Sequence, residues 1–143
     1  MLEFEVKAVV DDPESLKQDS TVYLFNKEQR ILLPIKMPPP SAVTILNARE
    51  TPNEIRPHIH NTAIRIIKAL KAEVDSITIY AYQEEIFYSY IKIRRGGNCL
   101  EIDARPSDAI SIALRQDVPV FVNESVYERV GIKVTKELLR NSI

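Results

Sequence analysis

The sequence predicts an α+β fold, in which a mixed, mostly antiparallel sheet is flanked by helices. Two observations lead to this expectation. Segments with the two-residue alternation of β-strands and segments with the spacing of amphipathic helices both recur along the chain. Three strand-like segments also follow one another with only short turns between them, which is typical of an antiparallel meander.

The chain is predicted to form a single domain over residues 1–143, with a core from about residue 3 to residue 131 and a short C-terminal helical tail. Its 143 residues fall in the size range of one domain, and 45% of them are hydrophobic, which is enough for a real core. No internal repeat, low-complexity segment or linker divides it.

The predicted strands alternate apolar and polar residues or are rich in β-branched and aromatic residues. In the first of them, Leu2, Phe4 and Val6 alternate with Glu3 and Glu5. Pro34 in the third indicates either an edge position or a strand near its end, because proline cannot donate to a neighbouring strand. The predicted strands are residues 2–10, 21–26, 30–36, 74–82, 86–94, 99–103 and 118–122.

The predicted helices begin at prolines or capping residues. The segment 57–71 is the most amphipathic, and a helical projection places His60 in its apolar arc. The residues predicted for its apolar face are Ile59, Ala63, Ile66, Ile67 and Leu70. The other predicted helices are 41–50, a segment starting at Pro106, 124–130 with Asn123 as its cap, and a short one capped by Thr135.

Composition excludes several classes of function. The net charge of −1 argues against tight coating of nucleic acid, although local and transient contact is compatible with it. The only cysteine, Cys99, allows neither an intrachain disulfide nor a paired-cysteine metal site. No apolar run approaches the roughly 20 residues of a membrane span, and the N-terminus alternates, so we expect a cytoplasmic protein with no membrane partner.

The segment 101–115, EIDARPSDAISIALR, concentrates the polar groups of the chain at a strand-to-helix junction. Glu101 and Asp103 lie two residues apart on a strand and share a face. One interpretation is structural, with the aspartates serving as a cap and as a favourable charge in the first helical turn. The other is that Asp103, Asp108 and Glu101 hold Mg²⁺ or Mn²⁺, while Arg105 neutralises a phosphodiester.

His60 has two interpretations as well. A histidine on the apolar face of a helix is commonly a satisfied core residue. Alternatively, its imidazole acts as a general base near neutral pH, with Asn61 orienting substrate or water.

The block EIDARPSDAISIALR, with the following DVPVFV, resembles the bifunctional nuclease domain family. The upstream segments RILLPI and RPHIHN are similar to elements of the same family, so the resemblance covers about residues 3–131. It implies a mixed-sheet scaffold, a homodimer and a nuclease that acts on both RNA and DNA. The polar residues that match by position are Arg56, His60, Asp103, Arg105, Ser107 and Asp108.

Two departures from the family pattern each remove a carboxylate. Residues 37–41, MPPPS, stand where the family has a glycine-glutamate pair, and Asn61 stands where it has an aspartate.

The predicted function is a nuclease or phosphodiesterase that acts through the junction, with Mg²⁺ or Mn²⁺ as its candidate cofactor. The alternative is a non-catalytic dimeric interaction or regulatory module. The predicted catalytic residues are Asp103, Asp108 and His60. The predicted substrate-binding residues are Arg56, Arg105, Ser107 and Asn61. The predicted metal ligands are Asp103, Asp108 and Glu101.

Overall fold

A computed structural model describes residues 1–11, 19–50 and 59–135. Along the chain the elements are β1 (Leu2–Asp11), β2 (Ser20–Asn26), β3 (Ile31–Met37), α1 (Pro39–Glu50), α2 (Ile59–Ala69), β4 (Glu73–Gln83), β5 (Ile86–Arg95), β6 (Asn98–Ala104), α3 (Pro106–Gln116), β7 (Val120–Val122), α4 (Glu124–Val130) and β8 (Ile132–Lys133).

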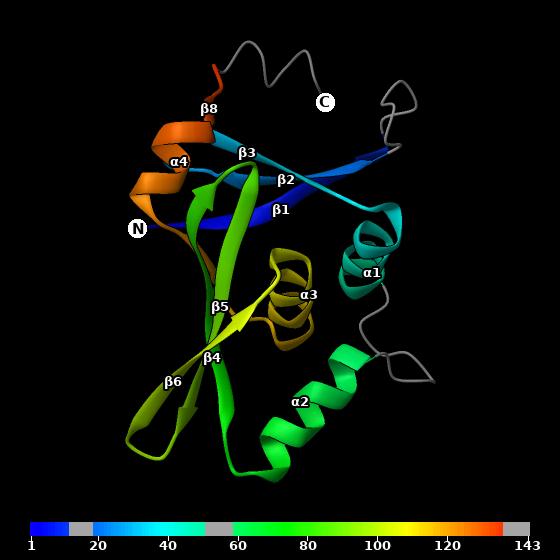
Figure 1. Ribbon diagram of the computed structural model, residues 1–143, viewed down its shortest axis with the longest axis vertical. Helices are drawn as coiled ribbons and strands as arrows, with labels where there is room; N and C mark the ends of the chain where they lie inside the picture. The colour runs from blue at the N-terminus through cyan, green and yellow to red at the C-terminus, as the bar shows by residue number, and fades with distance from the viewer. Residues whose placement is uncertain (12–18, 51–58, 136–143) are drawn as a thin grey trace.

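The strands form one sheet in the order β6-β5-β4-β7-β1-β2-β3-β8. All neighbouring pairs are antiparallel except β4 and β7. Strands β4, β5 and β6 form the expected meander, and α1, α2 and α3 lie along one side of the strands (Figure 1). The predicted α+β class with a mixed, mostly antiparallel sheet is confirmed.

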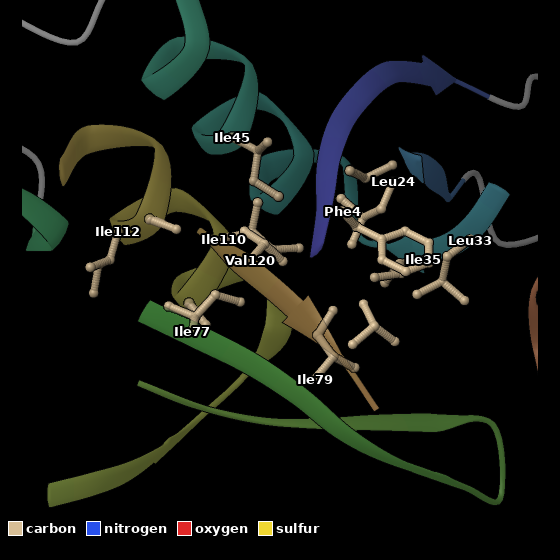
Figure 2. Packing of buried hydrophobic residues seen from close by; sticks show 14 of the residues in the cluster. Phe4, Leu24, Leu33, Ile35, Ile45, Ile77, Ile79, Ile110, Ile112 and Val120 are labelled. Atoms are coloured by element: carbon tan, nitrogen blue, oxygen red, sulfur yellow. The ribbon is translucent and has the colours of Figure 1, made fainter. Parts of the chain in front are cut away.

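Helix α3 is the centre of the core. Its residues from Ala109 to Ala113 are all buried, so the middle of this helix is covered by the sheet, α1 and α2. Figure 2 shows Ile110 of α3 among Ile45 of α1 and Ile77 and Val120 of the sheet. The side chains at the start of α3 are therefore held on a rigid element.

Helix α2 buries only part of the apolar face predicted for it. Ile59 is 74% exposed, and Ile66 and Leu70 are each 56% exposed, whereas His60 and Ile64 are buried. The helix contacts α3 and β4 along the line of His60 and Ile64, which leaves the apolar stripe beside that line without cover among the described residues. The prediction is confirmed for His60 and Ile67, which pack toward the core, and it was wrong for Ile59, Ile66 and Leu70. The apolar face is wider than the surface that α2 packs against.

Smaller differences occur near the ends of elements. The Asn123 side chain does not cap α4; its amide donates to the carbonyl oxygen of Tyr80 instead. Strand β8 was not predicted, and it pairs with β3 only at Ile31 and Leu32. Pro34 lies beyond this pairing, which is consistent with its lack of an N–H that could donate to a neighbouring strand. The predicted helix after Thr135 lies outside the described residues.

Gly131, which follows α4, tolerates no side chain. A Cβ atom here would overlap the carbonyl oxygen of Tyr127 and lie 2.7 Å from Cγ2 of Ile31. We expect Gly131→Ala to lower the free energy of unfolding by about 1–3 kcal/mol through overpacking. Gly97→Ala is the matched control, because nothing lies within 4 Å of its added methyl group. Equal effects of the two substitutions in chemical denaturation would contradict this packing.

Candidate active site

Three predicted site residues meet where α2 approaches the first turn of α3. The Nε2 atom of His60 lies 2.8 Å from Oδ1 of Asp108, and Nε of Arg105 donates to Oδ2 of the same carboxylate at 2.9 Å. His60 and Asp108 are 48 residues apart in the sequence, so only the packing of the two helices brings them together.

Local backbone geometry at the start of α3 places Arg105 over Asp108. Arg105 has extended backbone angles, φ −65° and ψ 145°, as the residue before a proline usually does. Pro106 then opens the helix, and Asp108 lies three residues after Arg105, the spacing at which side chains meet on a helix face. Arg105 makes no side-chain cap; its guanidinium pairs with the carboxylate.

The environment of Asp108 favours its charged form. Burial raises the pKa of this carboxyl, but the hydrogen bonds and charges of Arg105 and His60 outweigh burial, so that the pKa lies below its usual value. The Asp108 side chain is 33% exposed, that of His60 10% and that of Arg105 75%. The carboxylate thus joins a buried imidazole to an exposed guanidinium.

The lowered pKa of Asp108 predicts a pH dependence of stability. In the unfolded chain this carboxyl titrates near about pH 3.9, and in the folded chain below that value. Its contribution to stability is therefore fully present above about pH 4 and is lost as pH falls through the folded pKa. We expect the difference in unfolding free energy between the wild type and Asp108→Asn to shrink on going from about pH 5 to about pH 3. An unchanged difference in urea denaturation would contradict it.

The hydrogen bond to Asp108 fixes the state of the His60 ring. A carboxylate accepts but does not donate, so Nε2 carries a proton and the lone pair of the neutral ring lies on Nδ1. Nδ1 is buried and has no hydrogen-bond partner in residues 1–11, 19–50 and 59–135. Nδ1 is therefore the atom at which this imidazole would accept a proton.

A second polar link joins the same two helices. Nη1 of Arg115 donates to Oδ1 of Asn61 at 3.1 Å, and its Nε lies 3.4 Å from the Ser111 hydroxyl. The predicted substrate-binding residue Asn61 is thus engaged by α3, next to His60. Arg115 was not among the predicted site residues, although it follows Asp108 by seven residues and so lies on the same face of the helix.

Arg105 also lines a groove of about 250 Å³ between α3, the end of β3 and the β4–β5 turn. Its other polar side chains are Lys36, Ser41, Glu85 and Ser107. Met37, Pro38 and Ser41, from the segment that departs from the family pattern, also line the groove, as does the predicted substrate-binding residue Ser107. Lys36 and Glu85 were not predicted, because Lys36 follows the RILLPI segment within its strand, Glu85 lies in a turn, and neither belongs to a motif.

The structure separates Asp103 and Glu101 from Asp108. On β5 and β6, Ile91 pairs with Ile102, and Ile91 is part of the core on the helix side. Because side chains alternate along a strand, Asp103 and Glu101 project from the opposite face. There the hydroxyl of Tyr80 donates to Asp103 at 3.3 Å.

The three predicted metal ligands consequently do not fit one ion. Asp103 and Glu101 share a face of the sheet, Asp108 lies on the other side of it, and both oxygens of Asp108 accept hydrogen bonds from His60 and Arg105. Within the described part of the chain, no group of three histidine, cysteine, aspartate or glutamate side chains is placed to hold a metal. The predicted substrate-binding residue Arg56 lies outside the described residues.

The fold is an α+β domain, and its candidate site combines a histidine–carboxylate pair with a neighbouring groove lined by Lys36, Arg105 and Glu85. Comparison with known proteins shows to which family this domain belongs. Residues 22–135 match the sequence profile of the bifunctional nuclease domain, and the chain belongs to that family.

Relatives with this domain occur in bacteria and plants. The chain is 31% identical to an uncharacterised protein of Mycobacterium tuberculosis over 105 residues, which cover 73% of this chain and 62% of that protein. It is 30% identical to bifunctional nuclease 2 of Oryza sativa over 124 residues, which cover 85% of this chain and 38% of that protein. It is 27% identical to bifunctional nuclease 1 of Arabidopsis thaliana over 107 residues, which cover 73% of this chain and 33% of that protein.

The chain thus spans less than two thirds of the length of each of these relatives. None of the helices in the described ranges is both long enough and apolar enough to cross a membrane.

Proposed function

We propose that this protein is a phosphodiester hydrolase that cleaves RNA and DNA. The observation that carries the proposal is the meeting of His60, Asp108 and Arg105, with Arg105 lining a groove of uncommitted polar side chains. The names of the plant relatives support the same activity for this chain.

Each residue of the proposed site has a distinct task. Arg105 pairs with a non-bridging phosphate oxygen and offsets the charge that builds up there. Substrate binding exposes the buried Nδ1 of His60. This atom accepts a proton from the attacking water, whose oxygen forms the new bond to phosphorus. The bond from phosphorus to the leaving oxygen breaks, and the imidazolium returns its proton to that oxygen. Asp108 holds the ring and stabilises its charged form.

The proposal is tested with purified protein and single-stranded RNA and DNA labelled at one end. We expect both to be cut, and we expect removal of the guanidinium in Arg105→Met to slow cutting by about 100-fold, the usual scale for loss of one charge-stabilising donor. Lys27→Met is the matched control, because Lys27 pairs with Glu5 far along the chain from the site. Comparing rates with and without a chelator tests the predicted dependence on Mg²⁺ or Mn²⁺. Absence of cutting under all conditions would contradict the proposal.

One observation favours the alternative function of a non-catalytic module. Nδ1 of His60 is buried, and both Asp108 oxygens are engaged, so this trio also suffices as a link between α2 and α3. If the protein is such a module, Arg105→Met and Asp108→Asn would lower its melting temperature, and added nucleic acid would leave the melting temperature unchanged.

We further propose that the protein is a cytoplasmic homodimer. The support for dimerisation is the stripe of Ile59, Ile66 and Leu70 on α2, which a second copy would cover. Light scattering of the wild type and Ile66→Lys tests this assembly: the wild type should have the mass of two chains and the variant that of one.

A further inference from the structure

The groove beside Arg105 gathers polar side chains that have no task in the fold. The side chains of Lys36, Ser41, Glu85 and Ser107 line it, and none of them makes a hydrogen bond or ion pair with another described residue. Arg94, by contrast, is paired with Glu73 and Asp75. The unpaired groups that line the groove are available to a ligand.

The turn that carries Glu85 has an unusual backbone. Glu84 and Glu85 have φ values of 51° and 65°, and they connect the adjacent strands β4 and β5. Two successive left-handed residues form a hairpin turn that strongly favours asparagine and glycine. A pair of glutamates is therefore not explained by the turn itself, and only Glu85 of the two lines the groove.

The groove is lined by both cationic and apolar side chains. Lys36 and Arg105 supply the positive charges, and Ile86, Phe87 and Pro106 supply the apolar surface. Its volume of about 250 Å³ is below the range of about 300–1,000 Å³ that is usual for drug-sized ligands. The groove is therefore of a size for a small ligand, such as one flat ring system with a phosphate.

We propose that this groove binds a single nucleotide of the substrate strand and that Glu85 selects guanine. The inference rests on the proposed nuclease function. The phosphate lies between Lys36 and Arg105, and the base lies on the Phe87 side of the groove. The Glu85 carboxylate accepts hydrogen bonds at both oxygens, and guanine has two adjacent N–H donors on one edge. Adenine and cytosine have one amino group on that edge, and uracil has one ring N–H.

Binding of mononucleotides by the full chain tests the assignment. We expect 5′-GMP to bind at least ten-fold more tightly than 5′-UMP and than ribose 5-phosphate in calorimetric titrations. Glu85→Gln should remove most of the preference for GMP over UMP, since an amide has a single acceptor. Lys36→Met should weaken the binding of GMP and of UMP by a similar factor and leave the ratio of their affinities unchanged.

Glu84→Gln is the matched control, because Glu84 has the same left-handed backbone in the same turn but does not line the groove. It should leave the ratio at the wild-type value. Equal effects of the two glutamate substitutions, or ribose 5-phosphate binding as tightly as GMP, would overturn the assignment. Melting temperatures of both variants confirm that they are folded.

Strand cleavage distinguishes this inference from the function on which it rests. With oligonucleotides that contain one guanine in a run of uracil, the wild type should cut at one position relative to that guanine, and Glu85→Gln should cut along the whole run. Cleavage with no preference in the wild type would overturn the guanine subsite and leave the nuclease standing. Binding of GMP that depends on Glu85 in a protein that cuts nothing would leave the subsite standing and overturn the nuclease.

Discussion

His60→Gln is expected to lower the rate of phosphodiester cleavage by about 100- to 10,000-fold, the usual contribution of a general base. Glutamine reaches as far as the imidazole, and its amide donates to Oδ1 of Asp108 in place of Nε2. It does not accept a proton near neutral pH. The variant therefore keeps the link between α2 and α3 and loses only the general base. The rate of single-turnover cleavage of labelled RNA measures this loss.

His60→Ala serves as the companion variant, since it loses both the link and the base. We expect its melting temperature to fall, whereas that of His60→Gln stays near the wild-type value. If the glutamine variant cut RNA within about three-fold of the wild-type rate, His60 would be a structural residue and the non-catalytic module would be the better account.

Asp108→Asn is expected to have a far larger effect than Asp103→Asn. The amide at position 108 has one oxygen to accept hydrogen bonds from His60 and Arg105, where the carboxylate has two. When that oxygen pairs with Arg105, the largely buried Nε2–H of His60 is left without a partner, at a cost of about 1–3 kcal/mol. The His60 ring also loses its stabilising charge. We expect cleavage to fall at least about 100-fold.

Asp103→Asn changes only an exposed contact with Tyr80 on the opposite face of the sheet. Its rate and unfolding free energy should stay much closer to the wild type than those of Asp108→Asn. Equal losses of activity in the two variants would show that both carboxylates serve one site, against the separation seen in the fold.

The fold was predictable from the sequence because most of its strands can be recognised from local residue patterns. The alternation in residues 2–10 and the meander from 74 to 103 are properties of neighbouring residues, and all of these segments form strands. The insertion of β7 between β4 and β1 depends on contacts distant in the sequence, and nothing in VPVFV specifies it. How much of the apolar face of α2 is buried likewise depends on contacts distant in the sequence.

The candidate site was predictable only in part. Asp108 and Arg105 share a turn of α3, so their contact follows from helical spacing. The partnership of Asp108 with His60 required the packing of two helices. The adjacency of Asp103 to Asp108 in the sequence was misleading, because the strand ends between them and the two side chains leave on opposite sides. Glu85 lies in the groove because the sheet brings a turn to the start of α3.

The most direct test of the central claim, that His60 and Asp108 act as one catalytic unit, is the cleavage rate of the double variant His60→Gln/Asp108→Asn. Residues that act as a unit give losses that do not multiply. We predict that the double variant cuts RNA no more than about three-fold more slowly than the slower single variant. A loss equal to the product of the two single losses, or no loss in any of the three variants, would contradict the account.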